Sequence, residues 1–324
     1  MNDAEAFHFS AVRSADAQAH GSGLGDWEQR YEQLSHGPFE GLMEELRLGP
    51  VQIFRESTNR AVLQCGESRP GSVSVGFLSQ QVPTGWFCGR KLDQGQAIAA
   101  FGNQAFELFT GADSTISAVC VDLAMLQERD PPSADGDDGW LRGALRSAVL
   151  DQPGAAHHRL GQQLQEALRL AAERPDWLQR APVVQALADT LADGVLDCLG
   201  AARPRPQAAP GAAARRRILL RARDYMAAHA HEPVSVPQLC AAVGASRRTL
   251  QYAFEDALGL SPIHYLRLMR LNRVHIELLR GPADDTVGDV AARWGFWHLP
   301  RFAAEYRTLF GELPSQTRKR RAGA

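Results

Sequence analysis

Long apolar runs are missing from this chain of 324 residues. Residues 1 to 25 mix Gly, Ala, Ser and charged side chains, so we expect a flexible N-terminus there and neither a signal peptide nor a membrane anchor. Nothing else approaches the length of a membrane-spanning helix. Cysteines number only five, and they are scattered, which argues against a disulfide framework or a zinc site. A cytoplasmic protein without a membrane partner is expected.

Catalytic signatures are also missing. The sequence has no GxSxG elbow, Walker loop, HExxH pair or GxGxxG turn. His157 and His158 are adjacent, and neighbouring positions on a helix point in different directions, so they form a poor metal pair. We predict no catalytic residue, no metal ligand and no cofactor, and we do not expect an enzyme.

Net charge is close to zero overall, yet it is unevenly distributed. The chain holds 35 Lys and Arg against 37 Asp and Glu, a net charge of −2. Residues 211 to 324 hold 18 basic and 10 acidic side chains, a net charge of +8, which leaves −10 for residues 1 to 210. The C-terminal third is therefore a basic segment suited to binding phosphates.

That basic segment contains the same pattern twice. Each copy opens with a polar cap and a partner three residues on, Ser235 with Gln238 and Thr286 with Asp289. A short apolar helix follows, and a glycine such as Gly244 ends it and allows a sharp turn into a second helix. Ordinary helical hairpins are the alternative, but two matched copies on a basic segment favour two helix-turn-helix units. In such a unit the second helix enters the DNA major groove.

The first of these second helices has the chemistry to read bases. Ser246 is expected as its N-cap, and Arg247, Arg248, Gln251 and Tyr252 are expected on its groove-facing side. Arg can pair with guanine and Gln with adenine, so we predict direct base readout here. The alternative is that these side chains are merely exposed helix residues.

The second copy is poorer in base-reading side chains. Its exposed positions include His298 and Leu299, with Arg301 and Arg307 at the margins of the helix. Few of these can make a bidentate contact with a base. We therefore predict that this helix contributes mainly backbone positioning and shape readout.

These residues carry a family resemblance. The stretch from about Ile218 to Arg320 resembles the DNA-binding domain of AraC/XylS-type transcription regulators, most specifically in GFWHLPRFAAEYRTLFGELPS, Gly295 to Ser315. The GFWHL run is most similar to the branch that includes ethanolamine and amine-catabolism regulators. The resemblance implies two helix-turn-helix units joined by a long helix, expected over Pro262 to Leu279. It also implies promoter DNA, RNA polymerase, a small-molecule effector and a second copy of the chain as partners.

The region from Leu46 to Leu123 is rich in short apolar runs separated by Gly, Pro and Asn, which predicts a small barrel or sandwich. The resemblance agrees, because family members often carry a cupin-like sensor barrel there. Phe77, Trp86 and Phe101 are the predicted ligand-binding residues, with plain barrel core as the alternative.

After Trp140 the pattern becomes helical. Val184, Leu187, Leu191, Val195 and Cys198 mark one stripe, which serves either internal packing or pairing with a second copy. The family analogy makes this a dimerisation segment. An Ala- and Pro-rich stretch after it reads as a linker.

The resulting prediction is an α+β protein with an N-terminal β-rich cupin-like barrel, a helical dimerisation segment and a C-terminal all-α domain. The predicted domains are a flexible N-terminus over 1–25, a sensing and dimerisation domain over 26–200, a linker over 201–214 and a DNA-binding domain over 215–320. The predicted function is a ligand-responsive transcription regulator, an activator that acts as a homodimer. Two alternatives stay open: a ligand-binding enzyme fused to a DNA-binding domain, and a ligand-independent dimeric DNA-binding protein.

Overall fold

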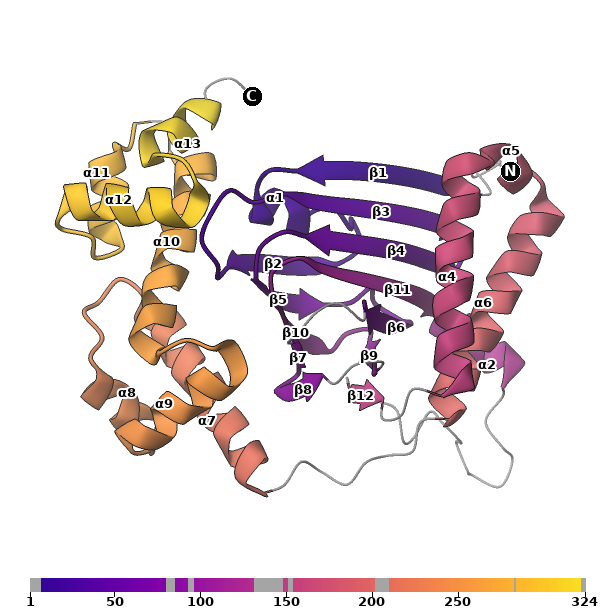
Figure 1. Cartoon of the computed structure of the whole chain (residues 1–324), viewed down its shortest axis with the longest axis horizontal. Helices are drawn as coiled ribbons and strands as arrows, with labels where there is room; N and C mark the ends of the chain where they lie inside the picture. Colours follow the sequence, from indigo (N-terminus) through magenta and orange to yellow (C-terminus); the bar gives the residue numbers. More distant parts are fainter. Residues whose placement is uncertain are drawn as a thin grey trace. The chain divides into compact units, whose positions relative to one another are not determined.

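The computed structural model describes residues 7–79, 85–92, 96–130, 148–150, 154–201, 210–282 and 284–321. The chain divides into two units. The first comprises Met1–Tyr31 and Glu40–Pro206, and the second comprises Glu32–Phe39 and Gln207–Ala324. The first unit combines sheets with helices and the second is mostly helical, as the α+β prediction requires (Figure 1). Within the described residues, no helix combines the length and apolarity needed to cross a bilayer.

The first unit is built on two antiparallel sheets. The seven-stranded sheet has the order β1 (His8–Ser14), β3 (Gly41–Leu48), β4 (Val51–Thr58), β11 (Ser114–Asp122), β6 (Ser72–Leu78), β9 (Ala97–Phe101) and β12 (Ala148–Leu150). The five-stranded sheet has the order β2 (Glu28–Gln33), β5 (Val62–Glu67), β10 (Ala105–Thr110), β7 (Gly85–Phe87) and β8 (Arg90–Leu92). The predicted strand-rich texture between Leu46 and Leu123 is confirmed.

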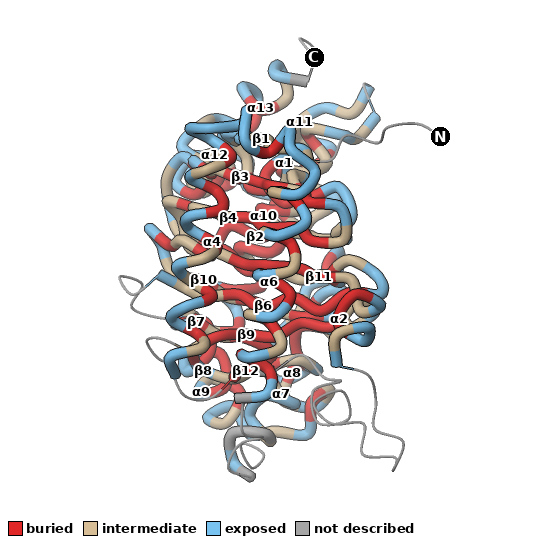
Figure 2. Tube along the Cα trace, turned by 90° about the vertical axis from the view of Figure 1, so that its right-hand side faces the viewer, coloured by how far each residue is buried: buried red, intermediate tan, exposed pale blue. Residues whose placement is uncertain are grey.

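Alternation along the strands divides the core of this unit into two layers. On β6, Val73 and Val75 belong to a cluster shared with the helices, whereas Ser74 and Gly76 face the space between the two sheets. The layer between the sheets contains Phe87 and Phe106 from one sheet and Ile98 from the other. Figure 2 shows the strands as largely buried for this reason.

The predicted barrel is not closed. The described strands form two separate sheets that pack face to face across an apolar layer. Strand composition indicates that strands exist, but it does not indicate whether the edge strands of two sheets pair with each other. The prediction of a cupin-like closed barrel is therefore corrected to two packed sheets.

Helices cover one face of the seven-stranded sheet. Besides α1 (Ala17–Gly21), this unit contains α2 (Leu123–Arg129), α4 (Ala155–Glu173), α5 (Pro175–Leu178) and α6 (Ala181–Ala201). Figure 1 shows α4 and α6 side by side across the ends of the strands. Val184, Leu191, Val195 and Cys198 of α6 are buried in the core that these helices share with the sheet, and Leu187 packs against it. The stripe predicted for dimerisation is thus used inside the unit, and a homodimer would need another surface.

The N-terminal segment is also corrected. Residues 1–25 were expected to be flexible, but β1 pairs along its whole length with β3, from His8 opposite Arg47 to Ser14 opposite Gly41. A short helix, α1, then follows with its cap at Asp16. Strand β1 has few apolar side chains, and it is fixed by backbone pairing that the side-chain pattern does not reveal.

The second unit contains α7 (Pro210–Ala228), α8 (Val236–Val243), α9 (Arg247–Leu258), α10 (Pro262–Arg280), α11 (Val287–Arg293), α12 (Leu299–Phe310) and α13 (Pro314–Arg321). Helix α10 matches the long helix expected from Pro262 to Leu279. Within the predicted linker over 201–214, Ala201 ends α6, and residues from Pro210 already belong to α7. Residues 202–209 lie outside the described part of the chain.

Candidate nucleic-acid interface

Helices α8 and α9 form the first helix pair, and local capping sets both ends of the turn between them. Ser235 accepts a hydrogen bond from the Gln238 backbone N–H while the Gln238 side chain accepts from Ser235, a capping box at the start of α8. Gly244 ends α8 with φ +66°, a left-handed conformation in which glycine avoids strain. Ser246 then caps α9 by accepting from the Thr249 N–H at 3.2 Å. All three predicted roles are confirmed.

The second helix pair, α11 and α12, repeats this arrangement. Thr286 and Asp289 form the capping box of α11. Gly295 has φ +79° in the turn, and His298 caps α12 by accepting from the Arg301 N–H at 3.1 Å. The same local chemistry thus builds both pairs. Because His298 serves as a cap, its Nδ1 is already used.

The exposed face of α9 carries the predicted base-reading side chains. Its opposite face, with Leu250 and Phe254, is buried. The Arg248 guanidinium lies 5.3 Å from the centre of the Tyr252 ring and donates to the Tyr252 hydroxyl at 3.2 Å. Gln251 Nε2 donates to Glu255 at 2.7 Å. These contacts between successive turns hold Arg248 and Gln251 extended along the helix surface. To contact a base edge, the two side chains would replace these hydrogen bonds with bonds to the base.

Helix α12 presents a different surface. Leu299 at its first position is 47% exposed. Arg301 donates to Glu305 at 2.8 Å, and Arg267 from α10 also bonds to Glu305. Arg307, exposed further along the helix, completes the set predicted here. The Glu305 carboxylate therefore holds two guanidinium groups near the middle of this helix. Burial raises the pKa of Glu305, but hydrogen bonds from Arg267 and Arg301 outweigh it and keep that pKa below its ordinary value.

One exposed residue of this turn was missed by the sequence analysis. Trp297 lies between Phe296, which is buried, and the cap residue His298, and it is 81% exposed. Among the described residues it is the most exposed of the large apolar side chains. The sequence offered one signal for this: if Phe296 packs into the core, the adjacent Trp297 must point away from it.

Basic side chains also surround the helix pairs. Arg215, Arg216 and Arg217 are exposed on α7, near the start of the unit. Arg215 lies 3.5 Å from Asp256 of α9, and Arg320 on α13 bonds to Glu312 at 2.6 Å. The exposed guanidinium groups of Arg215, Arg216 and Arg217 suit contact with phosphate groups.

The three predicted ligand-binding residues do not meet at one cavity. Phe101 lies in the core shared with the helices, and Phe77 packs against that core with its ring 6.3 Å from the His157 ring. Trp86 on β7 is half-buried, next to Phe87, which faces the layer between the sheets. Side chains alternate along a strand, so these three residues point away from that layer.

Comparison with known proteins agrees with the helical architecture of the second unit. A family model described as a helix-turn-helix domain matches residues 239–320. The probable thc operon regulatory protein of Rhodococcus erythropolis is 38% identical over 161 residues, which are 47% of this chain and 46% of that protein. The XylDLEGF operon transcriptional activator 1 of Pseudomonas putida is 31% identical over 172 residues, 52% and 50% of the two chains. The chain thus spans about half the length of these curated relatives.

A solved structure also matches about a third of the chain. The probable AraC family transcriptional regulator from Rhodopseudomonas palustris is 34% identical, and the match covers 32% of this chain and 96% of that one at a TM-score of 0.31. The capped helix pairs and the family model together define a protein with a helix-turn-helix domain. In this domain the chain is similar to AraC/XylS-type transcription regulators, and the two curated relatives are named as operon regulators.

Proposed function

We propose that this chain is a sequence-specific DNA-binding transcription regulator that reads two successive major grooves, with α9 and α12 as its two recognition helices. One observation carries the proposal: the solvent face of α9 gathers Arg247, Arg248, Gln251 and Tyr252 over a buried apolar face. Arg and Gln are the side chains that pair best with guanine and adenine edges in the major groove.

The two helices contribute differently to DNA binding in this proposal. Helix α9 supplies most of the sequence discrimination, since α12 exposes Leu299, His298 and two arginines that suit thymine methyl groups and phosphates. Helix α10, which joins the pairs, is long enough to hold them on one side of the duplex, where recognition helices lie about one helical turn apart.

The wider role is a proposal of the same kind. The relative from Pseudomonas putida is named as an operon transcriptional activator, which favours an activator for this chain, recruiting RNA polymerase at promoter DNA in the cytoplasm. Effector control and homodimer formation are part of this proposal. An enzyme fused to the DNA-binding domain is disfavoured by the names of the relatives.

The test is binding of the full chain to duplex DNA by fluorescence anisotropy, using sequences it selects from a random pool. Arg248→Ala and Gln251→Ala should each weaken binding to the selected site by about 1–3 kcal/mol while binding to random duplex changes little. Arg174→Ala, on the far more acidic first unit, is the matched control and should change neither. Equal losses on selected and random duplex would refute base reading by α9, and failure to select any sequence would refute the proposed function.

A further inference from the structure

The Glu32–Phe39 segment belongs to the second unit, although the rest of that unit begins only at Gln207. The boundary between the two units falls inside β2, directly after Tyr31. Within the segment, Glu32 and Gln33 are buried although both are polar. Buried polar side chains are almost always hydrogen-bonded, so the partners of these two residues indicate what the segment does in the second unit.

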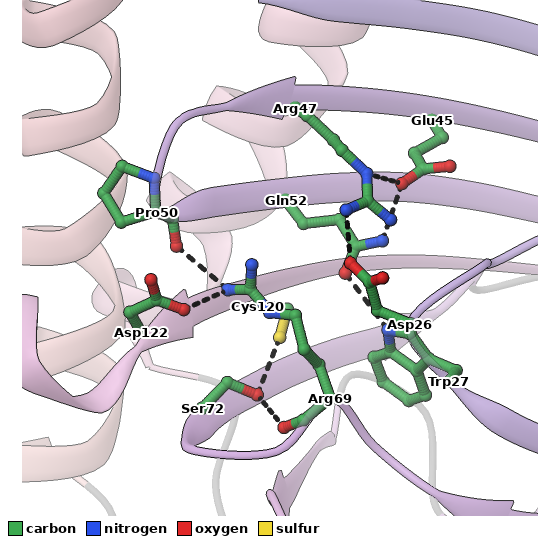
Figure 3. A network of polar contacts seen from close by, with 10 residues as sticks. All are labelled: Asp26, Trp27, Glu45, Arg47, Pro50, Gln52, Arg69, Ser72, Cys120 and Asp122. Atoms are coloured by element: carbon green, nitrogen blue, oxygen red, sulfur yellow. Dashed lines mark hydrogen bonds and ion pairs between the residues drawn. The ribbon is translucent and has the colours of Figure 1, made fainter. Parts of the chain in front are cut away.

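The start of β2 is fixed in the first unit. Trp27, the residue before the strand, donates its indole N–H to Gln52 Oε1 at 3.0 Å, and Gln52 Nε2 donates to Glu45 at 2.7 Å (Figure 3). The Trp27 ring also meets the ring of Phe54 edge-on, with the centroids 5.3 Å apart. Strand β2 is itself hydrogen-bonded to β5. The Glu32–Phe39 segment therefore continues a strand that is held in the sheets.

Glu32 joins the segment to the helices around α9. Its carboxylate accepts a hydrogen bond from the hydroxyl of Tyr265 on α10 at 2.9 Å, and that hydroxyl accepts from Arg223 Nε on α7 at 3.0 Å. All three side chains are buried. The Tyr265 ring also lies 5.6 Å from the ring of Phe254 on α9. A buried polar link thus connects the first residue of the segment to the helices that support the first recognition helix.

The same segment caps the C-terminal end of the other recognition helix, α12. The last four carbonyl groups of a helix have no partner within that helix. In α12, two of these carbonyls, those of Thr308 and Leu309, share the Gly37 N–H at 3.1 Å and 3.0 Å. Gln33 Nε2 also donates to the Leu309 carbonyl at 2.7 Å, and it donates to the Gly37 carbonyl at 2.7 Å. The segment therefore holds this helix end by hydrogen bonds to the backbone.

Pro38 approaches α12 closely at the residue that ends the helix. Gly311 has φ +76°, and a Cβ added there would lie 2.9 Å from Pro38 Cδ. Gly259 ends α9 in the same left-handed conformation, with φ +66°, but nothing lies within 4 Å of a Cβ added there. The two recognition helices thus end with the same backbone conformation, and they differ in the contact with Pro38.

We infer that the Glu32–Phe39 segment is a positioning element for DNA binding, which holds α12 in a fixed orientation to α9 so that both recognition helices meet their grooves together. This inference rests on the proposed function, because it assumes that both helices bind DNA. Gln33 is 1% exposed, so it acts through α12 and does not touch DNA. A surface held in its binding conformation binds more tightly, because less conformational freedom is lost on binding.

The experiment measures how much α12 adds to DNA binding by the full chain. Anisotropy gives the Kd for the selected duplex and for a shortened duplex that keeps only the stretch read by α9, where Arg248→Ala relaxes specificity. The Kd for the short duplex divided by the Kd for the full duplex reports the contribution of α12. Gln33→Ala should lower this ratio about tenfold, as the loss of one good base contact would. A purely structural role would weaken binding to both duplexes by the same factor and leave the ratio unchanged.

Gly311→Ala tests the same contact from the side of α12, and Gly259→Ala is its matched control. Both variants strain a left-handed backbone, but only Gly311→Ala displaces Pro38. Gly311→Ala should lower the ratio, and Gly259→Ala should keep it at the wild-type value. If Gln33→Ala does not fold, this pair of variants decides alone.

An unchanged ratio in folded Gln33→Ala or Gly311→Ala, or an equal fall in Gly259→Ala, would overturn the inference. The wild type separates this failure from a failure of the proposed function. A wild-type ratio near one would refute the reading of two grooves, and the inference with it. A large wild-type ratio that Gln33→Ala leaves intact would refute the positioning role alone.

Discussion

The hydroxyl of Tyr306 donates a hydrogen bond to Thr317 Oγ1 at 2.8 Å in the interior of the second unit. The same hydroxyl is bonded to His275 on α10, and Thr317 passes its own hydrogen to Glu312 at 2.6 Å. The side chains of His275, Tyr306, Thr317 and Glu312 thus form one hydrogen-bonded network, buried except at Glu312. A network of this kind fixes the position of a helix more narrowly than apolar packing alone.

Tyr306→Phe should destabilise the second unit by about 1–3 kcal/mol, because His275 and Thr317 each lose a buried partner. Urea unfolding of the full chain, followed by the signal of the second unit, measures the change. Tyr252→Phe removes a hydroxyl from a side chain that is 49% exposed and should leave unfolding unchanged. Equal effects of the two substitutions would show that the buried chain adds nothing to stability.

Replacing two glycines of the same unit with alanine should change its stability in opposite directions. Gly244 has φ +66° with nothing near an added Cβ, so Gly244→Ala should cost about 1 kcal/mol through backbone strain alone. Gly288 is helical, and an added Cβ there meets its neighbours at ordinary distances of 3.5 Å and more. Gly288→Ala should stabilise by about 0.5 kcal/mol. Thermal unfolding of both variants measures the two changes in stability. A change in the same direction for both variants would contradict the left-handed cap at Gly244.

Most of the second unit could be predicted from the sequence because its signals are local. The caps Ser235, Thr286 and Ser246 and the turn glycines each act within four residues of their own position, and the structure has them all in these roles. The exposure of the α9 side chains predicted to read bases follows from the same helical period. Trp297 was missed because its exposure could be inferred only through the burial of its neighbour Phe296.

The first unit was less predictable because its decisive contacts are distant in sequence. Whether Phe77 or Phe87 faces the space between the sheets depends on strand register, and a shift of one residue reverses every side chain. The separation into two sheets depends on which edges pair. The stripe on α6 could equally have met a second copy or its own sheet, and only packing decides this.

Acid should weaken the contacts of Glu305. Its pKa is held below the ordinary value because the hydrogen bonds from Arg267 and Arg301 outweigh burial. A lowered folded pKa means that this stabilisation is present above the ordinary value near pH 4.5 and is lost as the pH falls through the folded pKa. Arg301 is 68% exposed and Glu305 27%, so solvent screens the interaction and the gain is below about 1 kcal/mol.

Glu305→Gln should therefore be less stable than the wild type at pH 7, with the difference shrinking towards pH 3. Urea unfolding at a series of pH values measures it. Glu255→Gln is the control, since Glu255 is bonded to the neutral amide of Gln251. A difference that stays constant from pH 7 to 3 would rule out a charge effect at Glu305.

The last prediction concerns Asn272, which is buried on α10. Its side chain exchanges two hydrogen bonds with the backbone of Gln33, accepting from the N–H at 2.9 Å and donating to the carbonyl at 3.0 Å. Gln33 belongs to Glu32–Phe39, the segment that joins the second unit from far away in sequence. Asn272 also donates to Leu268 within its own helix at 2.9 Å.

In the full chain, Asn272→Ala should cost about 1–3 kcal/mol, because two backbone groups of Gln33 remain buried without these bonds. A fragment of residues 210–324 lacks Gln33, so the same substitution should cost clearly less there, and the unsubstituted fragment should be less stable than its unit in the full chain. Urea unfolding of the four proteins gives this comparison as a double-mutant cycle. If Asn272→Ala costs the same in both lengths of chain, Glu32–Phe39 contributes nothing to the stability of the DNA-binding unit, and the fragment alone is the complete folding unit.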